Sequence, residues 1–96
     1  MLNRNEIETK LKNLKPLLSD KYFVIRIGYF GSYLQNEQTE KSDIDILVEF
    51  AKPIGWAFFD LQEMLENELK IKVDLVSNKA IKEQLKETIL HQVKYV

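Results

Sequence analysis

The stretch that decides the fold runs from Asp43 to Phe50 and reads DIDILVEF. Its strict alternation predicts a β-strand, because successive side chains of a strand point to opposite faces. The apolar face carries Ile44, Ile46, Val48 and Phe50, and the other face carries Asp43, Asp45, Leu47 and Glu49. The two aspartates are therefore expected to project from the same face of the strand.

Two further strands are expected around this one. The stretch from Tyr22 to Phe30 is rich in β-branched and aromatic residues and is ended by Gly31-Ser32. Residues Ile71–Val76 are the third strand. The polar stretch from Gln35 to Ser42 is expected to be a surface connection, with one helical turn as an option at Ser32.

Three helices are expected between and around the strands. Asn5 and Glu8 have the spacing of a helix N-cap and its reciprocal acceptor, and Pro16 should bend or end the first helix. The apolar positions of that helix are Ile7, Leu11, Leu14 and Leu18. The second helix follows a turn at Pro53–Gly55 and carries Phe58, Leu61, Met64, Leu65 and Leu69. The third is expected to begin at a cap on Ser77 or Asn78 and to carry Ile81, Leu85 and Ile89.

These elements give the order αββαβα, with the tail from His91 to Val96 as an optional extended segment. The expected fold class is α/β (α+β), a small mixed β-sheet flanked by helices. At 96 residues the chain has the size of one domain, so residues 1–96 are expected to form a single domain. A start without an apolar leader and a sequence without cysteine favour a cytoplasmic location.

The feature that carries chemistry is the spacing of Gly31-Ser32 to Asp43 and Asp45. If the second strand folds back antiparallel on the first, all four residues meet at one rim of the sheet. Gly31 lets a phosphate approach the backbone, and Ser32 offers a hydroxyl and amides to an anion. Two aspartates on one face suit Mg²⁺, which prefers oxygen ligands. The pattern predicts a phosphoryl-transfer site.

A third carboxylate, Asp74, lies on a strand otherwise made of Val and Leu, where an unpaired charge would be unfavourable. It is expected to share the metal ions with Asp43 and Asp45, and two Mg²⁺ ions could serve an in-line displacement. The alternative is a strand-end residue paired with Lys70 or Lys72.

The segment GSYLQNEQTEKSDIDILVEF resembles the nucleotidyltransferase signature of the DNA polymerase β-like superfamily. Together with the continuation PIGWAFFDLQEMLENELKIKVDLVSNKAIKEQL, it resembles the minimal nucleotidyltransferase (MNT) family from about Val24 to Ile89. The resemblance implies a mixed sheet flanked by helices. It also implies that Asp43 and Asp45 hold both metal ions, that Asp74 is the third carboxylate, and that Gly31 and Ser32 contact the nucleotide.

The same resemblance implies a partner. Many members are antitoxins encoded beside a helical HEPN ribonuclease toxin, and some transfer AMP from ATP to a toxin tyrosine. The first hypothesis is therefore an Mg²⁺-dependent adenylyltransferase that modifies a hydroxyl, expected to be a tyrosine, of a HEPN-type partner. The short chain is expected to need that partner to complete the acceptor side of the site.

One departure from the family pattern supports a second hypothesis. Many relatives continue Gly-Ser with Arg-x-Arg-Gly, whereas this chain has Tyr33-Leu34-Gln35-Asn36. Lys41 and Arg26 are candidate replacements for the lost cations. Without such a replacement, the chain would be a catalytically weak or silent antitoxin that neutralises its toxin by binding. A third hypothesis, nucleotide addition to nucleic-acid tails, is disfavoured by the net charge of -1.

Two smaller features have competing interpretations. His91 could be a general base, but its expected place at a helix end favours a role with the helix dipole. Trp56, Phe58 and Phe59 could stack on a base, but an aromatic cluster at a helix start is more typical of a core or a partner interface.

Overall fold

The computed structural model describes residues 2–35, 37–39, 42–81 and 83–96. The elements in chain order are α1 (Arg4–Tyr22), β1 (Val24–Phe30), α2 (Ser32–Gln35), β2 (Ile44–Phe50), α3 (Ala57–Leu69), β3 (Val73–Ser77), the 3₁₀ helix η1 (Asn78–Ala80), α4 (Glu83–Gln92) and β4 (Lys94–Tyr95). The predicted order αββαβα is confirmed, with the optional helical turn and the optional extended tail both present.

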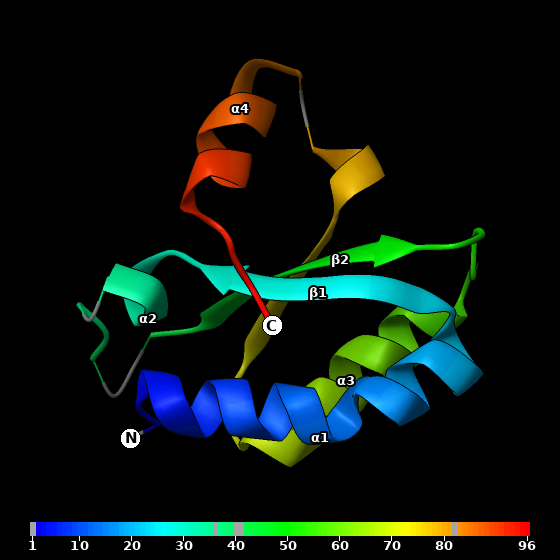
Figure 1. Ribbon diagram of the computed structural model, residues 1–96, viewed down its shortest axis with the longest axis horizontal. Coiled ribbons are helices and arrows are strands. Elements are labelled where there is room, and N and C mark those ends of the chain that lie inside the picture. The colour runs from blue at the N-terminus through cyan, green and yellow to red at the C-terminus, as the bar shows by residue number, and fades with distance from the viewer. Residues whose placement is uncertain (1, 36, 40–41, 82) are drawn as a thin grey trace.

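The strands form one mixed sheet in the order β3-β2-β1-β4. β1 pairs antiparallel with both β2 and β4, whereas β2 pairs parallel with β3. In Figure 1, α1 and α3 lie together on one side of β1 and β2, and α4 stands on the opposite side. The sheet therefore has one face covered by two long helices and one face turned towards α4.

The core lies between the sheet and the pair α1 and α3. The predicted apolar face of β2 is confirmed, since Ile44, Ile46 and Val48 are all fully buried. Buried side chains from β1, β3 and the two helices complete the core: Ile7, Leu11, Leu18, Tyr22, Val24, Ile27, Tyr29, Leu61, Leu65, Leu69, Val73 and Leu75. The aspartates of β2 consequently point away from the core, towards the second face.

The start of α1 differs from the prediction. The cap is Asn3, whose side chain accepts a hydrogen bond of 2.9 Å from the amide of Glu6, so the predicted cap at Asn5 is wrong. The expected partner Glu8 instead accepts a 2.6 Å hydrogen bond from the Tyr29 hydroxyl and lies 3.1 Å from the ammonium of Lys94. These contacts, the one from Tyr29 foremost, lower the pKa of Glu8 and join α1 to β1 and β4.

The first helix also continues through Pro16 and ends only after Tyr22, where Phe23 adopts a left-handed backbone with φ 57°. A proline removes one amide hydrogen bond, and the packing of the buried side chains on both sides of it holds the helix together. The first strand consequently begins at Val24 rather than at Tyr22.

The first residues of β1 pair irregularly with β2. The pairing of β1 with β2 shifts between Val24 and Arg26, which is a β-bulge, and the intervening Ile25 is 59% exposed. Further along β1, a Cβ at Gly28 would overlap the Val93 side chain and the Lys94 carbonyl. Glycine is therefore needed where β4 and the residue before it pack against β1. The two-residue β4 thus covers only a short part of the edge of β1.

The third predicted helix begins later than expected. Ser77 caps η1 rather than a long helix, and Ile81 adopts an extended backbone before α4 begins at Glu83. The expected cap for that helix at Ser77 or Asn78 is therefore wrong. Among the described residues, no helix is both long and apolar enough to cross a membrane.

Candidate functional site

The strand register brings the predicted residues to one rim of the sheet. Phe30, the last residue of β1, pairs with Asp45 near the start of β2, so Gly31 and Ser32 follow directly beside the aspartates. On its other side Asp45 pairs with Asp74 of β3. The antiparallel return that the sequence predicted is confirmed, and it gathers Gly31, Asp45 and Asp74 across three adjacent strands.

Gly31 is fitted closely to Asp45. It has φ 74°, a left-handed conformation that favours glycine, and a Cβ built on it would overlap Oδ2 of Asp45. Its carbonyl accepts 3.1 Å hydrogen bonds from the amides of Leu34 and Gln35, which starts α2 at Ser32. The Asp45 carboxylate therefore packs directly against the backbone of this tight turn, which leaves no room for a side chain at position 31.

The Asp45 carboxylate interacts with both of its acidic neighbours, Asp43 and Asp74. Asp45 is half-buried, and this burial, the charge of Asp74, a hydrogen bond with Asp74 and the charge of Asp43 together raise its pKa to about 6. Asp43 and Asp74 are exposed. Like charges so close together favour a bound proton or a bound cation between them, because either one reduces their repulsion.

Tyr33 is a site residue that the sequence reasoning missed. Its side chain is buried to 2% exposure directly after Ser32, and burial followed by the negative charge of Asp43 raises the pKa of its hydroxyl. The signal for it was its position after Gly31-Ser32, which the sequence analysis used only as a departure from the family pattern. Tyr33 anchors α2 in the core.

The oxygen ligands at this rim suit Mg²⁺ in its open mode of binding. Among the described residues, no group of three or more acidic, histidine or cysteine side chains is arranged to hold a metal ion. Mg²⁺ in nucleotide enzymes is typically held by one or two carboxylates together with substrate phosphates and water, rather than by a complete protein cage. Asp43, Asp45 and Asp74 beside the Gly31 turn fit that arrangement.

Comparison with known proteins places this geometry in a family. The model of the nucleotidyltransferase domain matches residues 6–96, which is nearly the whole chain. The chain belongs to the nucleotidyltransferase domain family.

Relatives of similar length share its sequence. A candidate protein adenylyltransferase from Methanocaldococcus jannaschii is 50% identical over 94 residues, covering 96% of both chains. The protein adenylyltransferase MntA from Thermococcus cleftensis is 42% identical over 97 residues, covering 100% of this chain and 98% of its own.

Solved structures share the fold. A candidate minimal nucleotidyltransferase superimposes with a TM-score of 0.83 at 26% identity, covering 97% of this chain and 95% of its own. A toxin–antitoxin crystal structure with AMP-PNP superimposes with a TM-score of 0.71 at 33% identity, covering 98% of this chain and 72% of its own. A complex of a tri-AMPylated HEPN toxin with an MNT antitoxin from Shewanella oneidensis superimposes with a TM-score of 0.65 at 28% identity, covering 93% of this chain and 69% of its own.

In this nucleotidyltransferase, Asp74 departs from one expectation. It is exposed, so the argument that its strand would bury an unpaired charge is wrong. Neither of the two salt bridges found among the described residues involves Asp74. Its side chain shares a hydrogen bond with Asp45 rather than an ion pair with Lys70 or Lys72.

The candidate replacement cations lie elsewhere or outside the described residues. Arg26 sits four residues before Phe30 on β1, where it forms a 3.3 Å salt bridge with Glu49 and stacks 3.8 Å from the centre of the Tyr95 ring. These contacts hold Arg26 away from the rim. Lys41 and Asn36 fall outside the described part of the chain.

The aromatic residues of this nucleotidyltransferase lie far from the carboxylates. Trp56 and Phe59 are 84% and 59% exposed, whereas Phe58 packs on the core and against Phe50 at 6.3 Å. Phe50 is the last residue of β2, about 16 Å along the strand from Asp45 at about 3.3 Å per residue. This distance speaks against base stacking at the carboxylate rim. His91 is exposed in the last turn of α4, as predicted.

Proposed function

We propose that this nucleotidyltransferase transfers AMP from Mg²⁺-ATP to a hydroxyl group of a HEPN-type partner protein and thereby acts as its antitoxin. The observation that carries the proposal is the group of three interacting carboxylates beside the Gly31 turn. Relatives named protein adenylyltransferase, and neighbours that contain AMP-PNP or a tri-AMPylated HEPN toxin, support the choice of donor and partner.

Asp43, Asp45 and Asp74 would hold Mg²⁺ in the proposed site. When bound, Mg²⁺ supplies positive charge that neutralises the phosphates and lowers the pKa of an oxygen bound to it. The raised pKa of Asp45 supports this assignment, because a carboxylate destabilised by two like charges gains most from a cation. The carboxylates and the triphosphate are both anionic, so neither is expected to accept the other without metal.

Gly31 and Ser32 would position the triphosphate. Without a Cβ at Gly31, a phosphate oxygen can approach the backbone beside Asp45, and the Ser32 hydroxyl can donate a hydrogen bond to it. A triphosphate held there would have its α-phosphorus within reach of the carboxylates. Among the described residues, the first turn of α2 offers no lysine or arginine, so the carboxylate-bound cations carry most of the charge neutralisation.

The transfer itself forms one bond and breaks one. The oxygen of the acceptor hydroxyl bonds to the α-phosphorus of ATP, the bond from that phosphorus to the bridging oxygen breaks, and pyrophosphate leaves. The hydroxyl proton passes to a carboxylate. Asp74 suits this role because it is exposed on the outermost of the three strands. A tyrosine, with an ordinary pKa near 10, needs such help near neutral pH.

Intact mass spectrometry of the partner tests the proposal. After incubation with this protein, ATP and Mg²⁺, the partner should gain one or more AMP units, and EDTA or the substitution Asp45→Asn should abolish the gain. A partner that gains no mass with the wild-type protein and Mg²⁺-ATP would contradict the proposed transfer.

A binding-only antitoxin is the second candidate, and one observation favours it. Where many relatives place arginines, this chain has the buried Tyr33, and Arg26 is engaged by Glu49 and Tyr95. A tight complex with unchanged partner mass would favour this candidate.

A further inference from the structure

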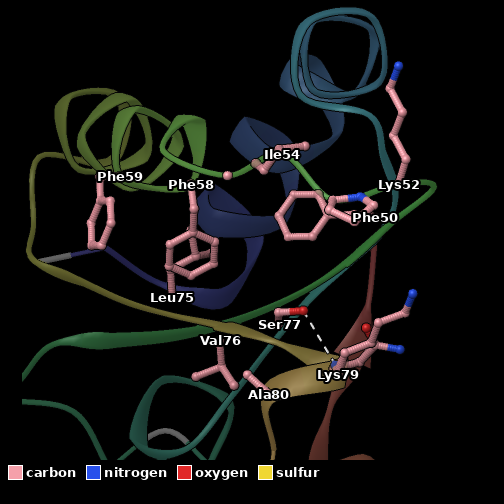
Figure 2. A pocket seen from close by; sticks show the side chains of 13 residues that line it. Phe50, Lys52, Ile54, Phe58, Phe59, Leu75, Val76, Ser77, Lys79 and Ala80 are labelled. Atoms are coloured by element: carbon pink, nitrogen blue, oxygen red, sulfur yellow. Dashed lines mark hydrogen bonds between the residues drawn. The ribbon is translucent and has the colours of Figure 1, made fainter.

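An apolar groove of about 520 Å³ lies between the start of α3 and β3, and its lining along β3 begins at Leu75, the residue after Asp74. Figure 2 shows Phe58 and Phe59 of α3 pointing from one side towards the strand that carries Leu75 and Val76. Ile54 and Phe50 close the far side of the groove. The groove is thus bounded by the start of α3 and by β3, which is an edge strand of the sheet.

The outer edge of β3 is blocked at one position and open further along. The amide of Val73 donates 2.9 Å to Oε2 of Glu66, and its carbonyl accepts 2.8 Å from Nε2 of Gln62, so α3 satisfies this residue. Backbone groups alternate in direction along a strand, so the amides of Leu75 and Ser77 also point outwards. Within the described ranges, no hydrogen bond satisfies the outward groups of Leu75.

The mouth of the groove is basic. Lys52 and Lys79 both line it and are both exposed. Lys52 lies 4.0 Å from the centre of the Phe23 ring, and the salt bridges found among the described residues include neither lysine. Figure 2 shows the Lys79 side chain beside Ser77, where β3 ends. Figure 2 shows the Lys52 ammonium turned away from the groove, so Lys79 is the cation at its rim. An apolar floor with this cation complements a segment that carries both an apolar side chain and a carboxylate.

We propose that an extended segment of the partner protein adds to the edge of β3 at Leu75–Ser77. The segment places an apolar side chain in the groove and a carboxylate against Lys79. Main-chain hydrogen bonds then supply affinity, and the groove supplies specificity. The inference rests on the proposed function, since it assigns the docking surface of that partner. It assigns docking to the outer edge of β3 from Leu75 to Ser77, next to the transfer site at Asp74.

The unpaired backbone decides between an extended segment and a helix. A helix satisfies its own backbone and would leave the outward amide and carbonyl of Leu75 covered without a partner, which is unfavourable. The block at Val73 limits the added strand to about three residues opposite Leu75–Ser77. A short strand with one anchoring side chain is therefore the occupant that fits.

Two matched pairs of variants test the docking surface by affinity for the purified partner. Ser77→Pro removes one outward amide at a residue whose φ of -87° is near the range of proline, and Ser77→Ala is its control. Lys79→Glu reverses the charge at the mouth, and Lys12→Glu does so on the exposed side of α1. We expect Ser77→Pro and Lys79→Glu each to weaken binding about tenfold relative to their controls.

Hydrogen exchange gives a readout independent of the variants. In the complex, the amide of Leu75 should exchange more slowly than in the free protein, whereas the amide of Lys12, on the exposed side of α1 and outside the groove, serves as a reference. Partner binding without added protection at Leu75, or wild-type affinity in Ser77→Pro and Lys79→Glu, would overturn the docking site and leave AMP transfer unaffected. A wild-type protein that neither binds nor modifies the partner would instead overturn the proposed function, and the docking site with it.

Discussion

The two ends of the β2–β3 pair have opposite chemistry although the same two strands build both. At the start of the strands, Asp45 and Asp74 face one another, and burial and like charges raise the pKa of Asp45. At the other end, Phe50 and Ser77 line an apolar groove that has Lys79 at its mouth and extends back along β3 to Leu75. The first end is destabilised by its own charges and gains from a cation, whereas the second has an unsatisfied edge and gains from a strand.

The largest expected effect separates the two ends by activity. Asp45→Asn should lower AMP transfer at least about 100-fold, because it removes a charge that acts on the reacting phosphates. The fold should persist, since the substitution also removes like-charge repulsion. Transfer measured by partner mass and unfolding followed by circular dichroism provide the two readouts. Asp60→Asn, on the exposed face of α3, should transfer normally, and wild-type transfer by Asp45→Asn would contradict the assigned role.

The two glycines with left-handed backbones sharpen the comparison through stability. Gly55→Ala has no atom within 4 Å of the new Cβ and should lose only the roughly 1 kcal/mol of the left-handed backbone. Gly31→Ala carries the same penalty, and its Cβ also meets Asp45 Oδ2, so it should lose about 2 kcal/mol or more and lower transfer. Urea unfolding of both variants measures the difference, and equal losses would contradict the close fit at Gly31.

The pH dependence of stability should distinguish the charged end. Asp45 has a folded pKa of about 6, above the 3.8 of a free aspartate. A raised carboxyl pKa means that the folded state binds the proton more tightly than the unfolded state. Protonation of Asp45 therefore stabilises the fold fully below about pH 3.8, and this stabilisation is lost as the pH rises through 6. Urea unfolding in EDTA at pH 4.5 and at pH 7 measures the effect. Between these two pH values the free energy of unfolding should fall more for the wild type than for Asp45→Asn. A loss of the same size in both proteins would contradict the raised pKa.

The smallest effect is expected beside the groove. Trp56 is 84% exposed, so Trp56→Ala should change the free energy of unfolding by less than about 0.5 kcal/mol. Phe58 packs against the core and Phe50, so Phe58→Ala should lower the free energy of unfolding clearly more than Trp56→Ala does. Thermal or urea unfolding of the pair measures this. A large loss for Trp56→Ala would mean that its ring belongs to the fold rather than to a free surface.

The sequence was most informative where pattern and topology act locally. The alternation of DIDILVEF predicted the faces of β2, and the return of β2 on β1 brought Gly31 and Asp45 together as expected. The helix cap was misplaced because Asn3 and Asn5 are each followed by a glutamate three residues later. The sequence offers two equivalent capping patterns, and the distant Tyr29 decides between them by engaging Glu8.

Features that depend on several distant segments were beyond sequence reasoning. Asp74 was expected to be costly in an apolar strand, but β3 is an edge strand and leaves it exposed. The groove combines a turn, a helix and a strand edge, and its open part exists because Gln62 and Glu66 happen to reach Val73 and not Leu75. No periodicity along the chain encodes such an arrangement.

The bulge at Val24–Arg26 has a consequence for self-assembly. Fibrillar growth by stacking of sheets needs two adhesive edges on each molecule, so that every added copy presents a new one. Here the bulge twists β1 and β4 covers part of its outer edge, so among the described strands β3 offers the regular unpaired edge, at Leu75–Ser77. Addition at a single side ends after one event, which makes this small sheet a terminator rather than a template for polymerisation.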